Sequence, residues 1–304
     1  MSTSGSPFSR LVTVPVTGST QDDLRSALRG PEAEAWPHLS ALRAMRQTAG
    51  RGRSGRAWVT PDDGALLVSV VLRPLVPARL LTWVPLLAGL AVRDALEPFV
   101  RGRGWRIGTK WPNDVVAVPE SSTVVAPVPG WASTRKIAGV LSELVTPEPS
   151  EGRTTQLSVA DEGPAGRDEA PMVILGIGVN IGQEVDDLPV AWAGSLRTLG
   201  VVDADGDSAH AAVAEVALNA IGHQLARRLE QWEGVCGDVD AGGGALGREL
   251  RAALTTLGQH VSVQAPDGEL SGLAVDVTPA LVLRNQVGDT EVRAGDVTLV
   301  RVTG

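Results

Sequence analysis

Apolar residues along this chain fall into runs that predict mostly β-strands. The two longest continuous runs, 64–73 and 172–181, are rich in valine, leucine and isoleucine, which is typical of strands buried on both faces. Shorter runs of similar character predict the remaining strands of the main part of the chain. These are expected at 10–16, 39–47, 105–110 and 137–145, and a short strand could form at 154–159.

Apolar residues that recur every three or four positions predict four helices. The longest covers 208–231, where Val213, Ala220 and Leu229 belong to one apolar stripe. Ser208 stands where it can cap this helix, because a serine hydroxyl can accept from a free N–H of the first turn. The other helices are expected at 21–29, capped by Ser19 or Thr20, at 82–99, capped by Thr82, and at 245–256.

After Leu257 the pattern changes to short β-rich runs with close turns. The runs lie at 260–264, 270–277, 281–284 and 297–302, with a weaker one near Glu291. We expect a small barrel at 257–304 that leans on a main domain at 11–256, because so few residues bury little apolar surface alone. Residues 1–10 are expected to form a flexible tail. The segments 117–134 and 146–171 are expected to be loops, the first long and mobile.

Composition indicates an ordinary globular protein with an acidic surplus. Of 304 residues, 43% are hydrophobic and 20% are charged, and the net charge of −8 disfavours a long polyanionic partner. The single cysteine excludes an internal disulfide and fits a reducing cytoplasm. The sequence has no cluster of cysteines and histidines that would predict a zinc site. Pro85, Arg93 and Asp94 interrupt the most apolar helix, and the first residues lack the apolar core of a signal peptide, so no membrane association is expected.

Residues 47–58 stand out against this acidic background. They read Gln-Thr-Ala-Gly-Arg-Gly-Arg-Ser-Gly-Arg-Ala-Trp, so that Arg51, Arg53 and Arg56 alternate with glycines. Guanidinium groups pair with carboxylate and phosphate oxygens, and glycine lets backbone N–H groups approach the same ligand closely. The loop therefore predicts a cradle for a small anion. A solvated basic turn and an RGG-like nucleic-acid contact are the alternatives.

Four further motifs accompany this loop. Together with the β-rich C-terminal segment, they resemble the biotin protein ligases, whose usual patterns are S-T-N, G-R-G-R-x-G-R, K-W-P-N-D, K-[LI]-A-G-[IV]-L-x-E and G-[IL]-G-x-N. The resemblance covers about residues 11–302, apart from the segments 117–134 and 146–171. The four motifs are Gly18-Ser19-Thr20 before the loop, and Lys110–Asp114, Arg135–Glu143 and Gly176–Asn180 after it.

The resemblance implies a ligase that works in two steps. Biotin and ATP would give biotinyl-5′-AMP and pyrophosphate, and the adenylate would then acylate a lysine of the biotin carboxyl carrier domain of acyl-CoA or pyruvate carboxylases. Mg²⁺ is expected on the ATP phosphates without an all-protein cage. The implied fold is α/β (α+β): a mixed sheet flanked by helices, as in class II aminoacyl-tRNA synthetases, with a C-terminal SH3-like β-barrel.

The same resemblance implies a role for each motif. Lys136 matches the family's catalytic lysine, Arg53 would clamp the acyl phosphate, and Asp114 would hold Lys136 or orient the attacking amine. Trp58 would stack on adenine or pack in the core. The biotin-binding residues would be Ser19, Thr20, Gln21, Gln47, Arg51, Gly52, Arg53, Lys136 and Gly139. The residues that bind ATP or the adenylate would be Arg51, Arg53, Arg56, Trp58, Asn113, Lys136 and Asn180.

One departure from the family pattern and two rival interpretations stay open. Gln21 stands where the family has asparagine, so its amide lies one carbon further out. A lipoate–protein ligase would share the fold and the chemistry, although the Gly/Arg loop favours biotin. A nucleic-acid-binding module would use the arginines of the loop, against the net charge. Because only about ten residues precede the first strand, we expect no N-terminal DNA-binding domain and no nucleic-acid partner.

Overall fold

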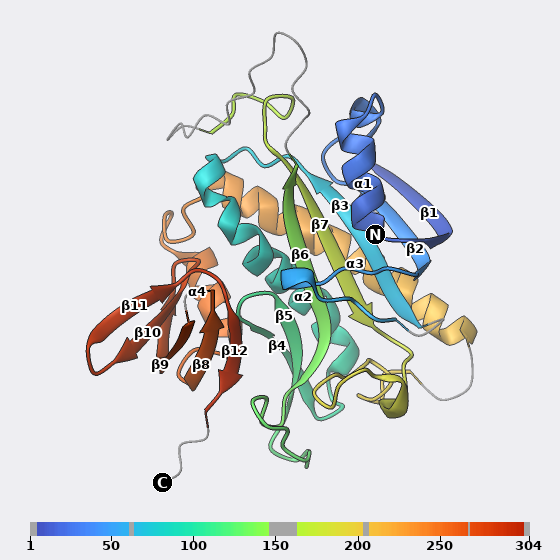
Figure 1. Cartoon of the computed structure of the whole chain (residues 1–304). Coiled ribbons are helices and arrows are strands. Elements are labelled where there is room, and N and C mark those ends of the chain that lie inside the picture. Colours follow the sequence, from blue (N-terminus) through green and yellow to red (C-terminus); the bar gives the residue numbers. More distant parts are fainter. Residues whose placement is uncertain (1–4, 61–63, 146–162, 203–206, 267, 301–304) are drawn as a thin grey trace.

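The structure, a computed structural model, describes residues 5–60, 64–145, 163–202, 207–266 and 268–300. Its larger sheet has seven strands in the order β1-β2-β3-β7-β6-β5-β4 (Figure 1). β1 and β2 are parallel, and every other neighbouring pair is antiparallel, so the sheet is mixed. The strands are β1 (Arg10–Thr17), β2 (Ser40–Gln47), β3 (Ala65–Leu72), β4 (Trp105–Lys110), β5 (Asp114–Pro119), β6 (Arg135–Val145) and β7 (Met172–Asn180).

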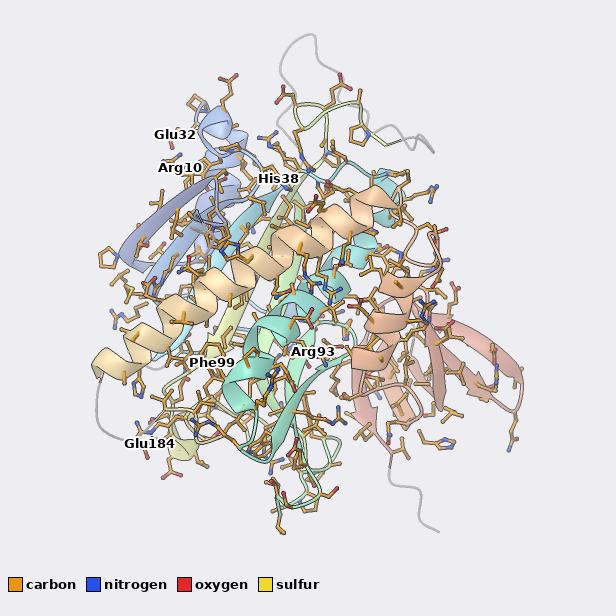
Figure 2. All side chains as sticks on the ribbon, turned by 180° about the vertical axis from the view of Figure 1, so that it is seen from behind. Arg10, Glu32, His38, Arg93, Phe99 and Glu184 are labelled. Carbon is orange, nitrogen blue, oxygen red and sulfur yellow. The ribbon has the colours of Figure 1, made fainter. Side chains whose placement is uncertain are left out.

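Helices cover both faces of this sheet. α2 (Val84–Val100) and α3 (Asp207–Gly234) cross its back, as Figure 2 shows, whereas α1 (Thr20–Arg29) packs on the other face. Within β3, Val70 belongs to the core under α2 and α3, and the next residue, Val71, packs with Leu24 of α1. Successive strand residues point to opposite faces, which explains why β3 reads as a continuous apolar run. No described helix has the length and apolar character needed to cross a membrane.

A second sheet follows α4 (Ala245–Ala253) and has five antiparallel strands in the order β11-β10-β9-β8-β12. Among the described residues β11 and β12 do not pair with each other, so the sheet does not close and an SH3-like barrel stays a prediction. Lys110 Nζ donates to the carbonyl of Val297 at 2.6 Å, which places β12 beside the end of β4. The strands are β8 (His260–Ala265), β9 (Gly268–Val277), β10 (Leu281–Asn285), β11 (Gly288–Val292) and β12 (Asp296–Leu299).

The segment expected as a loop at 117–134 is one only beyond Pro119. Its start belongs to β5, because the turn after Lys110 returns the chain directly as an antiparallel strand whose Val115 and Ala117 are fully buried. The rest is folded by backbone hydrogen bonds. Val128 N donates to Ala132 O at 2.7 Å, and Leu299 N donates to Gly130 O at 3.0 Å, which ties the segment to the end of β12.

Several element boundaries also differ from the expected ones. Thr82 does not cap α2, because a 3₁₀ turn, η3 (Ala78–Trp83), runs directly into that helix. α3 begins at Asp207, so Ser208 lies inside it, and α4 ends at Ala253. Phe8 of the expected tail is buried in the main core, so the tail is anchored there. The strand expected at 154–159 lies outside the described residues. The remaining 3₁₀ turns are η1 (Ala33–Ala35), η2 (Arg53–Gly55) and η4 (Val185–Asp187).

Candidate active site

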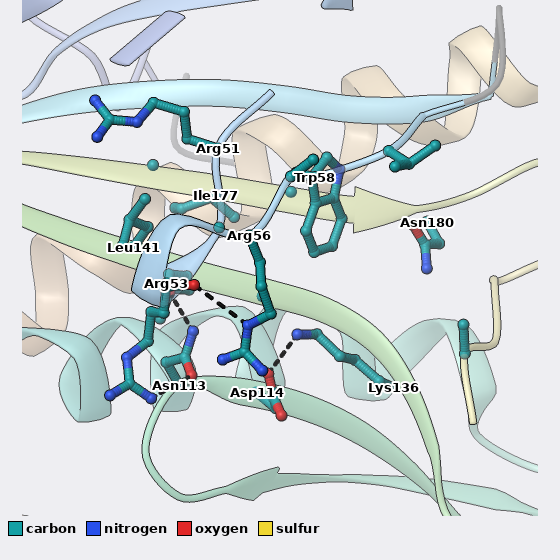
Figure 3. A pocket seen from close by; sticks show the side chains of 18 of the residues that line it. Arg51, Arg53, Arg56, Trp58, Asn113, Asp114, Lys136, Leu141, Ile177 and Asn180 are labelled. Carbon is teal, nitrogen blue, oxygen red and sulfur yellow. Dashed lines mark hydrogen bonds and ion pairs between the residues drawn. The ribbon is translucent and has the colours of Figure 1, made fainter. Parts of the chain in front are cut away.

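One cavity of about 460 Å³ gathers all the residues that the sequence singled out. It lies between β3, β7 and β6 on one side and the Gly/Arg loop, the turn after β4 and the start of β12 on the other (Figure 3). Motifs that are far apart in the sequence thus form one site. Its lining includes Ser19, Thr20, Gln21, Gln47, Arg51, Gly52, Arg53, Arg56, Trp58, Asn113, Asp114, Lys136, Gly139 and Asn180.

Neutral hydrogen-bonding groups form one end of the cavity. Gln47 Oε1 accepts from the backbone N of Thr20 at 2.8 Å and from its hydroxyl at 3.0 Å, and the Thr20 hydroxyl lies 2.7 Å from Ser69 Oγ. Ser19 Oγ accepts from Asp22 N at 3.4 Å, so it caps α1 while lining the cavity. These groups can match a polar, uncharged ligand, because both their donors and their acceptors are already oriented.

Ser69 is a functional candidate that the motifs did not predict. The residue is 1% exposed, and it is polar within the apolar run of β3. A buried hydroxyl needs a hydrogen-bond partner. A serine inside a buried apolar strand is therefore the sequence feature that could have identified Ser69.

If the resemblance holds and the neutral end takes biotin, Ser69→Ala should weaken biotin binding about three- to tenfold, because a neutral buried hydrogen bond contributes about 0.5–1.5 kcal/mol. Calorimetric titration with biotin measures this. Ser271→Ala, on the exposed side of β9, is the matched control; equal affinities of the two variants would remove Ser69 from the site.

Gln21 fills the position where the resemblance expects asparagine. Its side chain is buried, and Nε2 donates to Glu143 Oε2 at 3.5 Å. The amide oxygen lies so close to β7 that a Cβ on Gly176 would be 2.5 Å from it. The longer glutamine side chain thus reaches across to β7, and it can do so only because residue 176 is glycine.

The three arginines of the Gly/Arg loop diverge, as Figure 3 shows. Arg51 pairs with Asp22 of α1 at 2.6 Å. Arg53 is half-buried and donates to Asn113 Oδ1 at 3.4 Å and to Gly295 O at 3.3 Å. Both bonds are long, so an anion can replace them. Arg51 and Arg53 therefore each hold a different part of the chain.

Arg56 connects the loop to the second sheet. Its guanidinium lies 2.7 Å from Asp296 Oδ1, and this hydrogen bond raises the pKa of Arg56 above its ordinary value. Ser54 and Gly55 have φ of 54° and 74°, the left-handed conformation that closes the tight turn between Arg53 and Arg56. Gly52 N donates to Arg56 O at 2.7 Å, which completes the turn.

Trp58 lies flat on a pair of glycines. Gly139 of β6 and Gly178 of β7 are opposite each other in the sheet, and a Cβ on Gly178 would be 2.6 Å from Trp58 Cε2. The indole ring can therefore approach the sheet only because both residues lack side chains. Its Nε1 is buried without a hydrogen-bond partner in the described structure.

Lys136 and Asp114 form an ion pair in the cavity. Their Nζ and Oδ1 atoms are 2.5 Å apart, and Lys136 Nζ is 5.6 Å from the centroid of a Trp58 ring (Figure 3). The Lys136 side chain is 25% exposed, so its amine can still reach a ligand. The expected contact between Lys136 and Asp114 is confirmed. The pair places one cation and one carboxylate at the centre of the site.

Three other motif residues make hydrogen bonds that fix the backbone around the cavity. Asn113 Nδ2 donates to Val140 O at 2.7 Å, and Asn180 Nδ2 donates to Gly194 O at 2.9 Å, so each amide fixes a neighbouring segment. Lys110 is almost fully buried, and this burial lowers the pKa of its amine, while Asp114 opposes the shift. Its hydrogen bond to Val297 of β12 gives Lys110 a structural role.

Two carboxylates line the cavity, Asp114 and Asp296, and each is paired with a cation. The described residues contain no group of three or more His, Cys, Asp or Glu side chains placed to hold a metal ion. The donor set therefore suits a ligand that brings its own anionic groups. Sequence reasoning did not assign Asp296 because it meets the loop only through the packing of the second sheet against the first.

The fold and the site together define a ligase of the kind that joins a carboxylic acid to a protein through an activated intermediate. Residues 14–159 match the Biotin/lipoate A/B protein ligase family. The chain is 31% identical over 306 residues to a biotin–[acetyl-CoA-carboxylase] ligase of Mycobacterium tuberculosis, covering 98% of this chain and 91% of that one. The identity is 29% to a ligase of the same name from Paracoccus denitrificans, covering 92% and 97%. The chain belongs to the biotin protein ligase family.

Solved structures agree with this fold. A biotin protein ligase from Aquifex aeolicus in complex with biotin and ATP superposes with a TM-score of 0.64 and 23% identity, covering 97% of this chain and all of that one. At this identity the likeness establishes the fold alone. The agreement extends over both sheets, since nearly the whole chain is covered.

Proposed function

We propose that this chain activates biotin with ATP to give biotinyl-5′-AMP and then transfers biotin to a lysine of a biotin carboxyl carrier domain. The observation that carries the proposal is the Lys136–Asp114 pair, which shares one cavity with the neutral polar groups and with the arginines of the loop. The near-full-length similarity to a biotin–[acetyl-CoA-carboxylase] ligase supports biotin as the acid and a carboxylase domain as the acceptor.

Biotin would bind at the neutral end. Thr20, Gln47 and Ser69 offer donors and acceptors that suit the ureido ring, which is polar but uncharged. Apolar side chains of β6 and β7, among them Leu141 and Ile177, line the same cavity and would enclose the sulfur-containing ring and the aliphatic tail. The carboxylate would then extend toward Arg53 and Lys136, because biotin cannot place its charge at the neutral end without losing hydrogen bonds there.

In the activation step a carboxylate oxygen attacks the α-phosphorus of ATP. The bond from this phosphorus to the oxygen that bridges it to the β-phosphate breaks, and pyrophosphate leaves with that oxygen. Negative charge grows on the α-phosphate oxygens, where the Lys136 amine and the Arg53 guanidinium would stabilise it. Arg56 would turn from Asp296 to the β- and γ-phosphates of ATP. Its guanidinium already pairs with an anionic oxygen in this structure, and a phosphate oxygen would replace that carboxylate oxygen.

In the transfer step the acceptor lysine attacks the acyl carbon, and the bond from this carbon to the phosphate oxygen breaks to release AMP. The attacking amine must be uncharged, and Asp114 is the carboxylate placed to orient it and take its proton once Lys136 turns to the phosphate. Mg²⁺ would arrive with ATP, whose phosphates supply ligands that the described residues do not provide.

The same proposal assigns the parts of the chain. Residues 11–256 would form the catalytic domain and 257–304 a small SH3-like barrel that contributes Asp296 and Val297 to the cavity wall. We place the reaction in the cytoplasm, which the single cysteine supports.

Exchange of labelled pyrophosphate into ATP tests the proposal. We expect wild-type protein to catalyse this exchange only when biotin is present, because the reverse of the first step regenerates ATP from the adenylate. Lipoate in place of biotin is the control that separates the two kinds of ligase. Exchange that depends on lipoate and not on biotin would contradict the proposal, as would exchange that needs neither acid.

A further inference from the structure

Two tryptophans from separate loops stack at the end of the cavity opposite Thr20 and Ser69. The rings of Trp131 and Trp192 are 5.8 Å apart between centroids and lie within 8° of parallel. Trp131 comes from the segment 120–134, which none of the family motifs covers, and Trp192 from the loop after β7. Both line the cavity. Figure 1 shows these two segments close together at one end of the large sheet.

The Trp131 ring is held from several sides. It is 9% exposed, and Lys110 Nζ lies 4.1 Å from the centroid of one of its rings, which is within the range of a cation–π contact. The Thr134 hydroxyl donates to the Trp131 carbonyl at 2.6 Å. Gly130 packs on Thr298 of β12, and its carbonyl accepts from Leu299 N at 3.0 Å. The segment therefore presents Trp131 from a fixed position rather than from a free loop.

Trp192 is linked in turn to the reactive lysine. Lys136 N donates to Trp192 O at 2.7 Å, and Gly194 N donates to Lys136 O at 2.8 Å. Trp192 is partly exposed, and Trp131 covers one face of it. The adjoining wall of the cavity is formed by apolar side chains, those of Pro129, Pro189 and Val190. This end of the cavity is thus flat, aromatic and apolar, which suits a heteroaromatic ring and not a phosphate.

We infer that Trp131 is a positioning residue for nucleotide recognition: it fixes Trp192, whose uncovered face receives the adenine of ATP. The inference rests on the proposed function and gives the segment 120–134 a role in it. Because Trp192 is bonded to the backbone of Lys136, the stack also sets the distance between the base and the amine that acts on the α-phosphate. Lys110 contacts the Trp131 ring and also donates to Val297 of β12, so it holds Trp131 against β12.

The test separates ligands that contain the base from ligands that do not. In Trp131→Ala we expect the KM for ATP and the Kd for AMP to rise about three- to tenfold, since an aromatic pair contributes about 0.5–1.5 kcal/mol. The KM for biotin, and that for pyrophosphate in the exchange reaction, should change less than about twofold. Trp131→Phe should recover most of the loss. Trp105→Ala, which removes a partly buried tryptophan of β4 outside the cavity, is the matched control.

Circular dichroism gives a second readout. Two stacked indoles couple their transitions, so wild-type protein should show an exciton couplet that AMP perturbs, whereas both Trp131 variants should lack it and Trp105→Ala should keep it. A parallel rise of the KM for ATP and for biotin would show a general packing defect and overturn the inference. So would loss of the couplet with an unchanged KM for ATP. Wild-type protein without biotin-dependent exchange would instead overturn the proposed function itself.

Discussion

Replacing Lys136 by alanine is expected to slow adenylate formation on the order of 10²–10³-fold, the usual loss when one preorganised donor to a developing charge is removed. The structure gives two reasons for a loss of this size. The amine is the cation at the centre of the cavity, and its removal leaves the Asp114 carboxylate without its partner at 2.5 Å. That uncompensated charge would face the phosphates of ATP and repel them.

Three measurements check this prediction. Biotin-dependent pyrophosphate exchange should fall in Lys136→Ala, while biotin affinity should change far less, because the neutral end of the cavity is untouched. Synthetic biotinyl-5′-AMP should restore part of the carrier labelling. Adding Asp114→Asn to the alanine variant should recover part of the exchange, since it removes the unpaired charge. A Lys136→Ala protein with normal exchange would show that another group stabilises the α-phosphate.

Site residues that belong to a short sequence motif could be predicted from the sequence. Site residues that reach the cavity only through packing of distant segments could not. Closely spaced glycines and arginines identify the loop before any contact is known, and the strand that follows Lys136 is predicted by its apolar pattern. All fourteen predicted residues line one cavity, yet their partners needed the fold. Trp131 and Asp296 reach the site only because the segment 120–134 and β12 pack beside it, and no local pattern specifies such contacts.

The errors have physical causes as well. The segment after Asp114 is rich in proline and serine only beyond Pro119, and averaging over the whole stretch concealed the buried strand β5. Arg51 and Arg53 are close in sequence but hold different parts of the chain. In the structure the tight turn of the loop sends one toward Asp22 and the other toward Asn113. Charge alone predicts an anion site, whereas backbone geometry decides which arginine faces it.

Arg53→Gly is the substitution that we expect to separate synthesis of the adenylate from its retention. Biotinyl-5′-AMP is a reactive mixed anhydride, so a site that releases it would acylate nearby amines at random. Arg53 links the Gly/Arg loop to Asn113 and to Gly295 through two long hydrogen bonds, and it can exchange both for the acyl phosphate. Its loss removes a charge-assisted bond of about 1.5–3 kcal/mol and adds backbone freedom to the loop.

Release of the adenylate should therefore rise roughly ten- to a hundredfold in Arg53→Gly, since each 1.4 kcal/mol is a factor of ten. A streptavidin blot of serum albumin incubated with enzyme, biotin and ATP measures the leak. The background is low because Lys110 and Lys136 are the chain's only lysines, one buried and one half-buried. Arg106→Gly, an exposed arginine of β4, is the control. If Arg53→Gly makes adenylate at a comparable rate and labels albumin no more than wild type does, then Arg53 does not retain the intermediate, and the remaining candidates are Arg56 and the Trp58 ring above Gly139 and Gly178.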